Sequence, residues 1–354
     1  MASRSLAALG AIVATNAMTS IAQNMSFGAA NFYVSDNVTV APITFPNQFR
    51  EMVAGNLFVP KDFDSTTKAS AIVVGPPFGA AKEQSANLYA TKLAEQGFIT
   101  ISIDPGYWGP VDGQPRNSVL PDMFAESFSG AVDYLTLQDY VDHERIGVLG
   151  ICGSGSWAVS ATKLDTRIKA LATVSMYDMG AASRDGMENA IGLEQRQAMI
   201  EGDTRWRQSR VDNPETAFAA GFGRPPLNEN STDVDREFFD FYQTPRAEYP
   251  PVGSTLNLTR PALSMNRFMN YWPLSGLDVV QGRPVMFVAG TQAHSREFSV
   301  DAYNLAAHPK ELVWVQDAGH VDLYDRTELI PFHTLATFFQ NGLSAANVTV
   351  AHRR

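Results

Sequence analysis

The stretch that decides the fold of this chain reads Arg145-Ile146-Gly147-Val148-Leu149-Gly150-Ile151-Cys152-Gly153-Ser154-Gly155. Its first half is a short apolar strand that runs directly into a turn of small residues. Residues 156–164 behind the turn are compatible with a helix. A strand, a tight turn and a helix in this order are typical of a nucleophile elbow, in which the turn lifts one side chain into an exposed, strained position.

Cys152 occupies the apex of this turn and is the predicted nucleophile. Gly150 and Ser154 are the small residues two positions before and after it. The usual motif is G-x-S-x-G, so the chain has Cys in place of Ser and Ser154 in place of the last Gly. Ser154 is the alternative nucleophile, because Cys152 and Ser156 flank it with small residues too. The structural alternative is a cysteine that only fills space in the core.

The composition limits the classes of protein to which this chain can belong. Its 354 residues allow one large domain or two small ones, and 45% hydrophobic and 18% charged residues are ordinary for a globular protein. A net charge of −10 argues against nucleic acid or an anionic membrane as partner. The single cysteine excludes an internal disulfide. No apolar stretch reaches the roughly 20 residues that span a bilayer.

The N-terminal residues 1–37 resemble a signal or a flexible extension. Residues 6–18 are small and mostly apolar, and Ser20-Ile21-Ala22 resembles a signal cleavage site. Five sequons for N-glycosylation begin at Asn24, Asn37, Asn230, Asn257 and Asn347. These features favour a secreted glycoprotein. The alternative is an extension on a cytoplasmic enzyme.

Strands and helices alternate along most of the chain. Near-continuous apolar runs at residues 71–74, 98–103, 146–151, 169–174, 284–289 and 312–315 alternate with helical patterns such as those of residues 83–96 and 123–137. Residues 38–59 form an antiparallel pair with a turn at Pro46-Asn47. This order predicts an α/β fold with a mostly parallel sheet covered on both faces.

One long interruption divides the predicted sheet into two parts. The alternation stops after Asp178 and resumes at Pro284, and the intervening residues contain helical stretches and many aromatic residues. We expect a core in two parts (38–178 and 284–345), a helical cap inserted between them (179–283) and a short tail (346–354). A separate domain is less favoured because the chain must return to the same sheet.

The carboxyl ends of the strands are where an open α/β sheet places its site. The first apolar run ends in the loop Gly75-Pro76-Pro77-Phe78-Gly79. We expect the Phe78 amide and the Gly153 amide to donate to a developing oxyanion, as acyl transfer requires. An ordinary turn rich in Gly and Pro is the structural alternative.

His320 follows the last strand and is the predicted general base. It lies after Cys152 in chain order, as the base does in nucleophile-elbow enzymes. His294, past the penultimate strand, is its competitor. For the acid that orients the imidazole we favour Asp178, with Asp322 and Glu297 as alternatives.

Many separate stretches of this sequence, between about residues 38 and 345, resemble the α/β-hydrolase superfamily and, within it, a dienelactone-hydrolase-like group. The matching stretches begin at Gly75 (GPPFGAAKEQS), Ile103 (IDP), Gly113 (GQPR), Arg145 (RIGVLGICG), Met176 (MYDM), Leu193 (LEQR), Ala293 (AHSR) and His320 (HVDLYD). Fungal members of this group resemble polyketide transferases and thiohydrolases of secondary metabolism. The resemblance implies the fold and a Cys-His site without fixing a substrate.

The resemblance also exposes one departure from the family pattern. Dienelactone hydrolases use Cys at the elbow, which favours Cys152, but their acid follows the penultimate strand, where this chain has Ala293. The acid has therefore moved, or hydrolysis is weakened. A thiol with a poor activator of water would suit acyl transfer, in which the acyl-enzyme must survive until an acceptor arrives.

These observations predict acyl hydrolysis or transfer on a small-molecule or carrier-bound ester or thioester. Tyr107, Trp108 and Tyr177 are the predicted substrate-contacting residues, with core packing as their alternative role. No metal or cofactor is implied, because the sequence shows no His/Cys cluster and no G-x-G-x-x-G after the first strand. The alternatives are a non-hydrolytic cyclase or a catalytically silent binding protein on the same fold.

Overall fold

The structure, a computed structural model, describes residues 30–110, 117–213, 226–249, 254–255 and 265–344. Residues 1–29 of the predicted N-terminal extension and the sequons at Asn24, Asn257 and Asn347 lie outside these residues. A single eight-stranded sheet organises the described part, in the order β1-β2-β4-β3-β5-β6-β9-β10. The strands are β1 (Val38–Pro46), β2 (Met52–Pro60), β3 (Ala69–Gly75), β4 (Ile99–Ile103), β5 (Val141–Ile151), β6 (Ile168–Val174), β9 (Val285–Gly290) and β10 (Lys310–Val315).

The sheet is antiparallel at one edge and parallel elsewhere. β1 pairs with β2 and β2 with β4 in antiparallel register, whereas the pairs from β4 to β10 are parallel. On β1 buried or half-buried residues largely alternate with exposed ones, while β4 is buried throughout. This difference follows from position, because an edge strand has one solvated face and a central parallel strand is covered on both.

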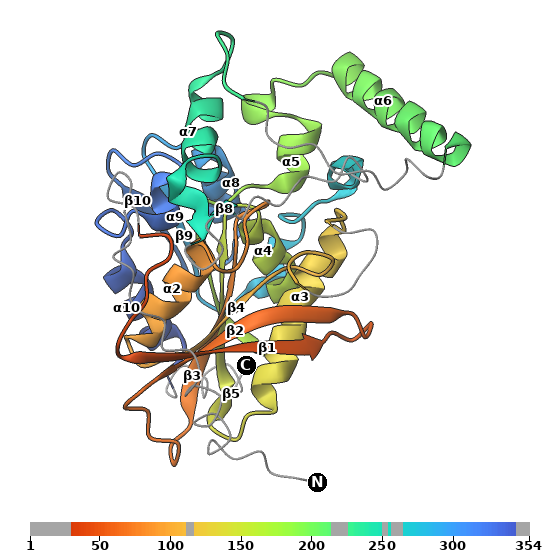
Figure 1. Cartoon of the computed structure of the whole chain (residues 1–354). Helices are drawn as coiled ribbons and strands as arrows, with labels where there is room; N and C mark the ends of the chain where they lie inside the picture. Colours follow the sequence, from red (N-terminus) through yellow and green to blue (C-terminus); the bar gives the residue numbers. More distant parts are fainter. Residues whose placement is uncertain (1–29, 111–116, 214–225, 250–253, 256–264, 345–354) are drawn as a thin grey trace.

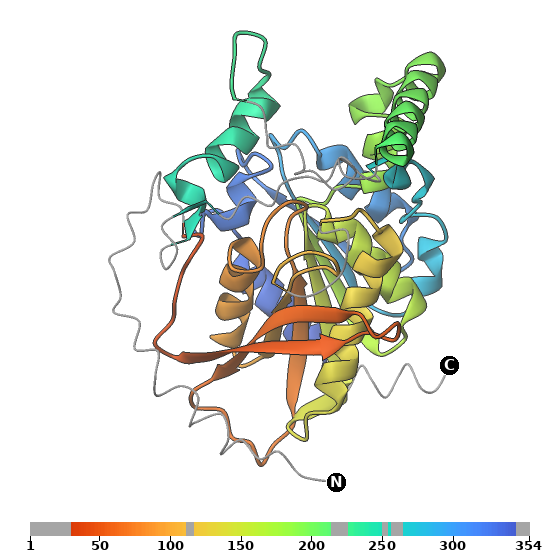
Figure 2. The same cartoon turned by 45° about the vertical axis from the view of Figure 1, so that its right-hand side comes forward.

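Helices cover both faces of the sheet (Figures 1 and 2). They are α2 (Ser85–Ala94), α3 (Pro121–Thr136), α4 (Ser154–Leu164), α8 (Arg296–Leu305), α9 (Asp322–Asp325) and α10 (Phe332–Gly342). Alternate residues of β3 enter two separate hydrophobic cores. Val73 packs in the core that contains α3, α4 and α8, and Val74 packs in the core that contains α2, α9 and α10. The predicted α/β fold with a doubly covered, mostly parallel sheet is confirmed.

A long insertion separates β6 from β9, where the sequence predicts a cap. Its elements are α5 (Met179–Arg184), η3 (Met187–Asn189), α6 (Leu193–Asp212), α7 (Asp233–Tyr242), η5 (Pro245–Ala247), β7 (Glu248–Tyr249), β8 (Ser254–Thr255), η6 (Met265–Asn270) and η7 (Leu277–Val280). In Figure 1, α5, α6 and α7 lie beyond the same end of the sheet. None of the residues of α6 is buried, and the helix projects from the body of the protein (Figure 1).

Arg246 fastens the insertion to the core beside α9. Its guanidinium makes two hydrogen bonds to the carboxylate of Asp325 and one to that of Asp240, and the Arg246 and Asp325 side chains are almost fully buried. The backbone of Asp325 in turn accepts from the Ala30 amide at 3.0 Å. The residues that follow α7 are thereby held against the helix that follows His320.

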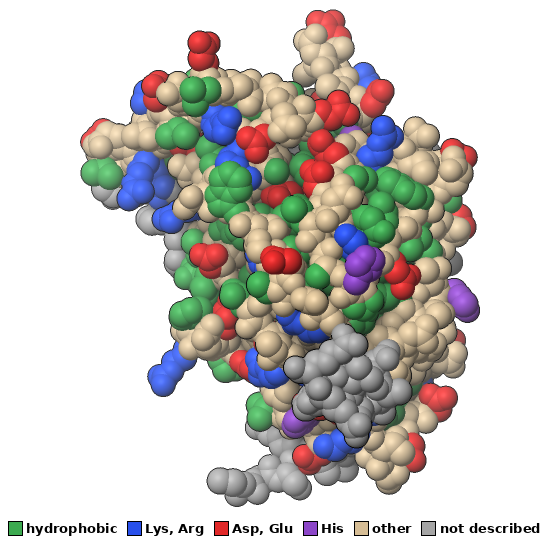
Figure 3. Space-filling model, turned by 180° about the vertical axis from the view of Figure 1, so that it is seen from behind, with side chains coloured by type: hydrophobic (Ala, Val, Ile, Leu, Met, Phe, Trp, Pro, Cys, Tyr) green, Lys and Arg blue, Asp and Glu red, His purple; other side chains and the backbone are tan. Residues whose placement is uncertain are grey.

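The surface of the described part carries mixed charge. On the face shown in Figure 3, Lys and Arg side chains are interspersed with Asp and Glu side chains. Among the described residues no helix is long and apolar enough to cross a membrane. The two sequon asparagines in this part, Asn37 and Asn230, are exposed.

Candidate active site

The turn between β5 and α4 holds Cys152 in a backbone conformation that L-residues rarely adopt. Its φ is 54°, in the left-handed region. Three hydrogen bonds hold the peptide groups of Cys152: its amide donates to the Val174 carbonyl (3.0 Å), and its carbonyl accepts from the amides of Gly155 (2.9 Å) and Tyr177 (3.0 Å). A strained residue held in this way is the geometry of a nucleophile elbow.

The residues around the turn must be small because atoms of neighbouring residues lie very close to them. A Cβ on Gly150 would lie 2.2 Å from the carbonyl oxygen of Ser154, and one on Gly155 would lie 2.5 Å from the Cβ of Met176. Ser154 itself is fully buried, and its hydroxyl donates to the Pro76 carbonyl. Ser154 therefore joins the elbow to the loop after β3, and its position gives no support to the alternative nucleophile.

His320 lies in the loop between β10 and α9 and is fully buried. Its Nδ1 is hydrogen-bonded to the hydroxyl of Ser295 at 2.5 Å, and its Nε2 to the hydroxyl of Tyr324 at 2.8 Å. Burial, with a smaller effect of the neighbouring His294, lowers the pKa of His320 well below its ordinary value. The imidazole is therefore neutral at pH 7, as a general base must be.

The Tyr324 hydroxyl connects this histidine to the elbow. Besides His320 Nε2, it is hydrogen-bonded to the side chain of Cys152, which is 5% exposed. Burial, followed by the effect of Cys152, raises the pKa of Tyr324 well above its ordinary value. Tyr324 therefore stays a phenol, able to accept one proton and donate another. The thiol, the phenol and the imidazole form one hydrogen-bonded series.

Asp178 does not take part in this series, contrary to the sequence-based prediction for the acid. Its carboxylate accepts from the Ala181 amide at 2.8 Å and caps the N-terminus of α5. Burial raises the pKa of Asp178, while the Ala181 amide and the Arg184 guanidinium oppose that shift. Both ring nitrogens of His320 already have other partners, so Asp178 does not orient the imidazole.

The two alternative acids also have other partners. Asp322 accepts from the Gly319 amide at 2.8 Å and pairs with Arg326, also at 2.8 Å. Glu297 accepts from the Glu188 amide at 2.8 Å. The partner of His320 Nδ1 is instead Ser295, two residues after Ala293. The loop after the penultimate strand thus does supply the group that contacts the histidine, but as a hydroxyl and not as a carboxylate.

The Gly153 and Phe78 amides, the predicted oxyanion donors, lie close to each other at the elbow. A Cβ built on Gly153 would come within 3.4 Å of the Phe78 nitrogen and 2.8 Å of the Phe78 Cβ. Among the described residues neither amide has a hydrogen-bond acceptor. Two free neighbouring amides next to the thiol are what stabilises a tetrahedral oxyanion.

A second histidine stands next to the first. The His294 and His320 ring centroids are 4.8 Å apart. His294 Nε2 is hydrogen-bonded to the Tyr177 hydroxyl at 2.7 Å, and His294 Nδ1 lies 3.2 Å from a carboxylate oxygen of Glu237, on α7. Phe238, the next residue of α7, packs against both imidazoles. The insertion therefore contributes side chains to the site.

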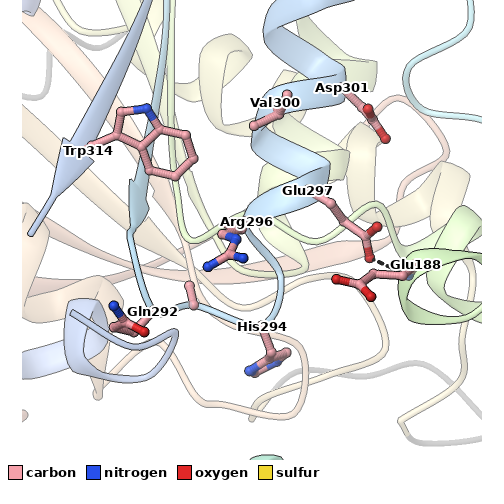
Figure 4. A pocket seen from close by; sticks show the side chains of 9 residues that line it. Glu188, Gln292, His294, Arg296, Glu297, Val300, Asp301 and Trp314 are labelled. Atoms are coloured by element: carbon pink, nitrogen blue, oxygen red, sulfur yellow. Dashed lines mark hydrogen bonds between the residues drawn. The ribbon is translucent and has the colours of Figure 1, made fainter. Parts of the chain in front are cut away.

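His294 also lines a hollow of about 510 Å³ whose wall Figure 4 shows. The other lining residues are Glu188, Gln292, Ala293, Arg296, Glu297, Val300, Asp301 and Trp314. Cys152, His320 and Tyr324 do not line it, so the hollow borders the second histidine and not the elbow. Among the described residues no group of three or more His, Cys, Asp or Glu side chains could hold a metal ion.

Comparisons with known proteins identify the family of this chain. A family model described as PET hydrolase-like matches residues 29–185. The uncharacterized protein PA2218 of Pseudomonas aeruginosa is 41% identical over 88% of this chain and 83% of its own length. The uncharacterized protein YcjY of Escherichia coli is 35% identical over 81% of this chain and 93% of its own. This chain belongs to the α/β-hydrolases.

Two solved structures have a fold similar to that of this chain. The crystal structure of PA2218 superposes with a TM-score of 0.82 at 39% identity, covering 88% of this chain and 96% of that one. The α/β-hydrolase GrgF of Penicillium superposes with a TM-score of 0.67 at 20% identity, covering 86% of this chain and 99% of that one. In sequence, the polyketide transferase grgF is 24% identical over 73% of this chain and 84% of its own. The resemblance predicted from the motifs is confirmed.

The three predicted substrate-contacting aromatics occupy different positions in this α/β-hydrolase. Trp108 is buried, its Nε1 donates to the Ser118 carbonyl at 2.9 Å, and its ring lies 5.2 Å from that of Phe78. Tyr107 is half-buried beside it, with a φ of 67°. Tyr177 contacts both histidines, His294 through its hydroxyl and His320 through its ring. The structure thus brings Tyr177 to the centre of the site, while Trp108 is part of the core beside Phe78.

Sequence reasoning missed Ser295, Tyr324 and Glu237. Ser295 escapes notice because the expected residue at that loop is acidic. Tyr324 is four residues after His320, and the one-turn helix α9 returns it to the imidazole. That spacing is a signal that could have been used. Glu237 reaches the site from the inserted segment, and the sequence carries no sign of that contact.

Proposed function

We propose that this α/β-hydrolase transfers acyl groups from an ester or thioester to water or another acceptor, through an acyl-enzyme on Cys152. The observation that carries the proposal is the hydroxyl of Tyr324, hydrogen-bonded to both the Cys152 side chain and His320 Nε2. It provides a path along which the thiol can lose its proton to a buried, neutral imidazole. A thiolate is the nucleophilic form of cysteine.

The first half of the reaction forms the acyl-enzyme. The Cys152 thiol gives its proton to the phenol oxygen of Tyr324, and the phenol gives its own proton to Nε2 of His320. The sulfur attacks the substrate carbonyl carbon, and the oxyanion lies against the Gly153 and Phe78 amides. The C–O or C–S bond of the substrate breaks. The leaving alcohol or thiol takes the proton of the Tyr324 hydroxyl, and Tyr324 regains one from Nε2 of His320.

Ser295 has a positioning role in this mechanism. A neutral imidazole donates from one nitrogen and accepts at the other. Because Nε2 must accept from Tyr324, Nδ1 carries the hydrogen and donates to the Ser295 hydroxyl, 2.5 Å away. A hydroxyl holds this tautomer but stabilises an imidazolium less than a carboxylate does. The site is therefore suited to a thiol nucleophile, which needs less activation than an alcohol.

The relatives and the side chains at the elbow support a proposal for the acyl substrate. One relative at 24% identity is a polyketide transferase, and an apolar acyl chain of this kind is our proposed substrate class. Phe78, Trp108, Trp157 and Phe268 form an aromatic cluster directly behind the oxyanion amides. Tyr107, half-buried beside this cluster, remains a predicted substrate contact, and the buried Trp108 supports Phe78 from the core.

Intact-mass labelling with a series of acyl thioesters of N-acetylcysteamine, from acetyl to octanoyl, tests the proposal. We expect a mass increase of one acyl group in the wild type and in Ser154→Ala, and none in Cys152→Ala. His333→Gln, on the exposed side of α10, serves as the control and should label as the wild type does. Labelling lost in Ser154→Ala and kept in Cys152→Ala would reassign the nucleophile. No labelling of any variant would favour the silent binding protein or the cyclase.

A further inference from the structure

Glu237, His294 and Tyr177 form a second hydrogen-bonded series that the mechanism above does not use. A Glu237 carboxylate oxygen lies 3.2 Å from His294 Nδ1, and His294 Nε2 lies 2.7 Å from the Tyr177 hydroxyl. The three residues come from α7, the loop after β9 and the loop after β6. A carboxylate, an imidazole and a hydroxyl in this order are the components of a base that removes a proton from a hydroxyl.

This second series lies against the catalytic one. The rings of Tyr177 and His320 are 5.1 Å apart and nearly perpendicular, and the Tyr177 amide donates to the carbonyl of Cys152 at 3.0 Å. The backbone of Tyr177 is therefore bonded to the elbow, and its ring packs edge-on against the imidazole of the first series. Figure 4 shows His294 at one end of the residues that line the hollow.

The two histidines differ in their access to an incoming acceptor. His320 is fully buried with both nitrogens bonded inside the protein, so a second substrate cannot reach it directly. The His294 side chain is 14% exposed, lines the hollow of about 510 Å³, and has a carboxylate partner. Glu237 would stabilise an imidazolium at His294, whereas His320 has only hydroxyl partners.

We propose that Tyr177, His294 and Glu237 deprotonate the acceptor in the second half of the reaction. This inference rests on the proposed acyl-enzyme. The acceptor hydroxyl gives its proton to the Tyr177 oxygen, and the Tyr177 proton passes to His294 Nε2. The acceptor oxygen bonds to the acyl carbon, and the bond from that carbon to Cys152 sulfur breaks. His294 releases its proton to water, and the thiolate regains one from water through His320 and Tyr324.

The hollow beside His294 indicates which acceptors fit. Three carboxylates line it, from Glu188, Glu297 and Asp301, against one guanidinium, from Arg296. A carboxylate-bearing or phosphate-bearing acceptor would be repelled there. We therefore propose a neutral alcohol as the acceptor that approaches His294 through this hollow. Propane-1,2-diol and lactate form a matched pair of probes, because both carry a secondary hydroxyl and only lactate carries an anionic group.

The test separates acylation from deacylation. With a p-nitrophenyl ester, the burst of p-nitrophenol reports acylation, and intact mass reports the lifetime of the acyl-enzyme. In His294→Gln and Tyr177→Phe we expect a burst rate close to wild type and an acyl-enzyme lifetime about 100-fold longer. Glu237→Gln should act in the same direction while keeping the oxygen that accepts from the Val321 amide at 2.6 Å. His333→Gln is the control for an unchanged lifetime.

Several outcomes would overturn the inference. Equal slowing of burst and deacylation would show that these residues only support the structure, and an unchanged lifetime in all three variants would exclude the proton path. Lactate as effective an acceptor as propane-1,2-diol would refute the assignment of the hollow. No acyl-enzyme in the wild type would refute the proposed function, and the inference with it.

Discussion

The hydroxyl of Tyr324 lies 2.8 Å from Nε2 of His320, four residues earlier in the chain, and is also hydrogen-bonded to Cys152. Histidine and tyrosine are one turn apart because the loop after β10 leads directly into α9. The consequence is chemical. A phenol with a raised pKa is inserted in the path between the nucleophile and its base, so proton transfer from the thiol depends on a third residue.

Tyr324→Phe tests that dependence. The ring should keep its packing against Phe241, whose centroid is 4.9 Å away, so the substitution removes the hydroxyl alone. We expect the burst of acylation to slow by about 100-fold, because the thiol loses its path to His320. The burst phase measured with a p-nitrophenyl ester gives the rate. Tyr303→Phe, on α8 and away from the site, is the matched control. A burst in Tyr324→Phe as fast as in the wild type would exclude the relay.

Ser295→Ala tests the positioning of the imidazole. Loss of the hydroxyl leaves His320 Nδ1 without its partner, and the tautomer that accepts at Nε2 is no longer favoured. We expect acylation to fall by about 10- to 100-fold with little change in KM. Ser299→Ala is the control, because Ser299 is buried on α8, the helix that Ser295 precedes, and its hydroxyl has no hydrogen-bond partner among the described residues. Equal effects of both substitutions would assign Ser295 to packing.

The sequence could predict the sheet, the elbow and His320 because each has a local signature. Apolar runs between turns locate the strands. Gly150 marks the turn because a Cβ there would lie only 2.2 Å from the Ser154 carbonyl oxygen. The partners of His320 have no such signature. Ser295 is one serine among many, and Asp178 has the composition of a catalytic acid but the local geometry of a helix cap. Which side chains meet at the edge of the sheet depends on the conformations of the loops, and these cannot be deduced from the composition.

The buried neutral state of His320 predicts how stability depends on pH. Its pKa is lowered in the folded protein relative to about 6.5 in the unfolded chain, so below that pH the unfolded state binds more protons. The contribution of His320 to the free energy of unfolding is therefore fully present above about pH 7. It falls as the pH drops below 6.5, by up to about 1.4 kcal/mol per pH unit.

Urea unfolding of the wild type and His320→Gln between pH 8 and pH 5 measures this effect. The difference in unfolding free energy between the two should stay constant above pH 7. Below pH 6.5 the wild type should lose stability relative to the variant. Contributions of buried carboxyl groups such as Asp325, whose pKa is raised chiefly by burial, cancel in the difference. His333→Gln should run parallel to the wild type. A constant difference for His320→Gln down to pH 5 would show that His320 titrates normally.

The strained backbone at Cys152 predicts that a glycine there would stabilise the fold, although the thiol would be lost. A non-glycine residue in the left-handed region costs about 1–2 kcal/mol, and the φ of Cys152 is 54°. Glycine at this position removes that strain. Its greater conformational freedom in the unfolded chain lowers the free energy of unfolding by about 0.5–1 kcal/mol, which offsets part of the effect. Cys152→Gly should therefore be more stable than Cys152→Ala by about 0.5–1 kcal/mol, although both lack the thiol and should form no acyl-enzyme.

The same pair of substitutions at Ser160, inside α4, provides the control with the opposite sign. Helical backbone favours Ala over Gly by about 1 kcal/mol, so Ser160→Gly should be the less stable of the two. Urea unfolding of the four variants gives both differences. If Cys152→Gly were also less stable than Cys152→Ala, the turn would not be strained. The hydrogen bonds from Cys152 to Val174, Gly155 and Tyr177 would then stabilise a relaxed backbone instead of holding the nucleophile in an unfavourable one.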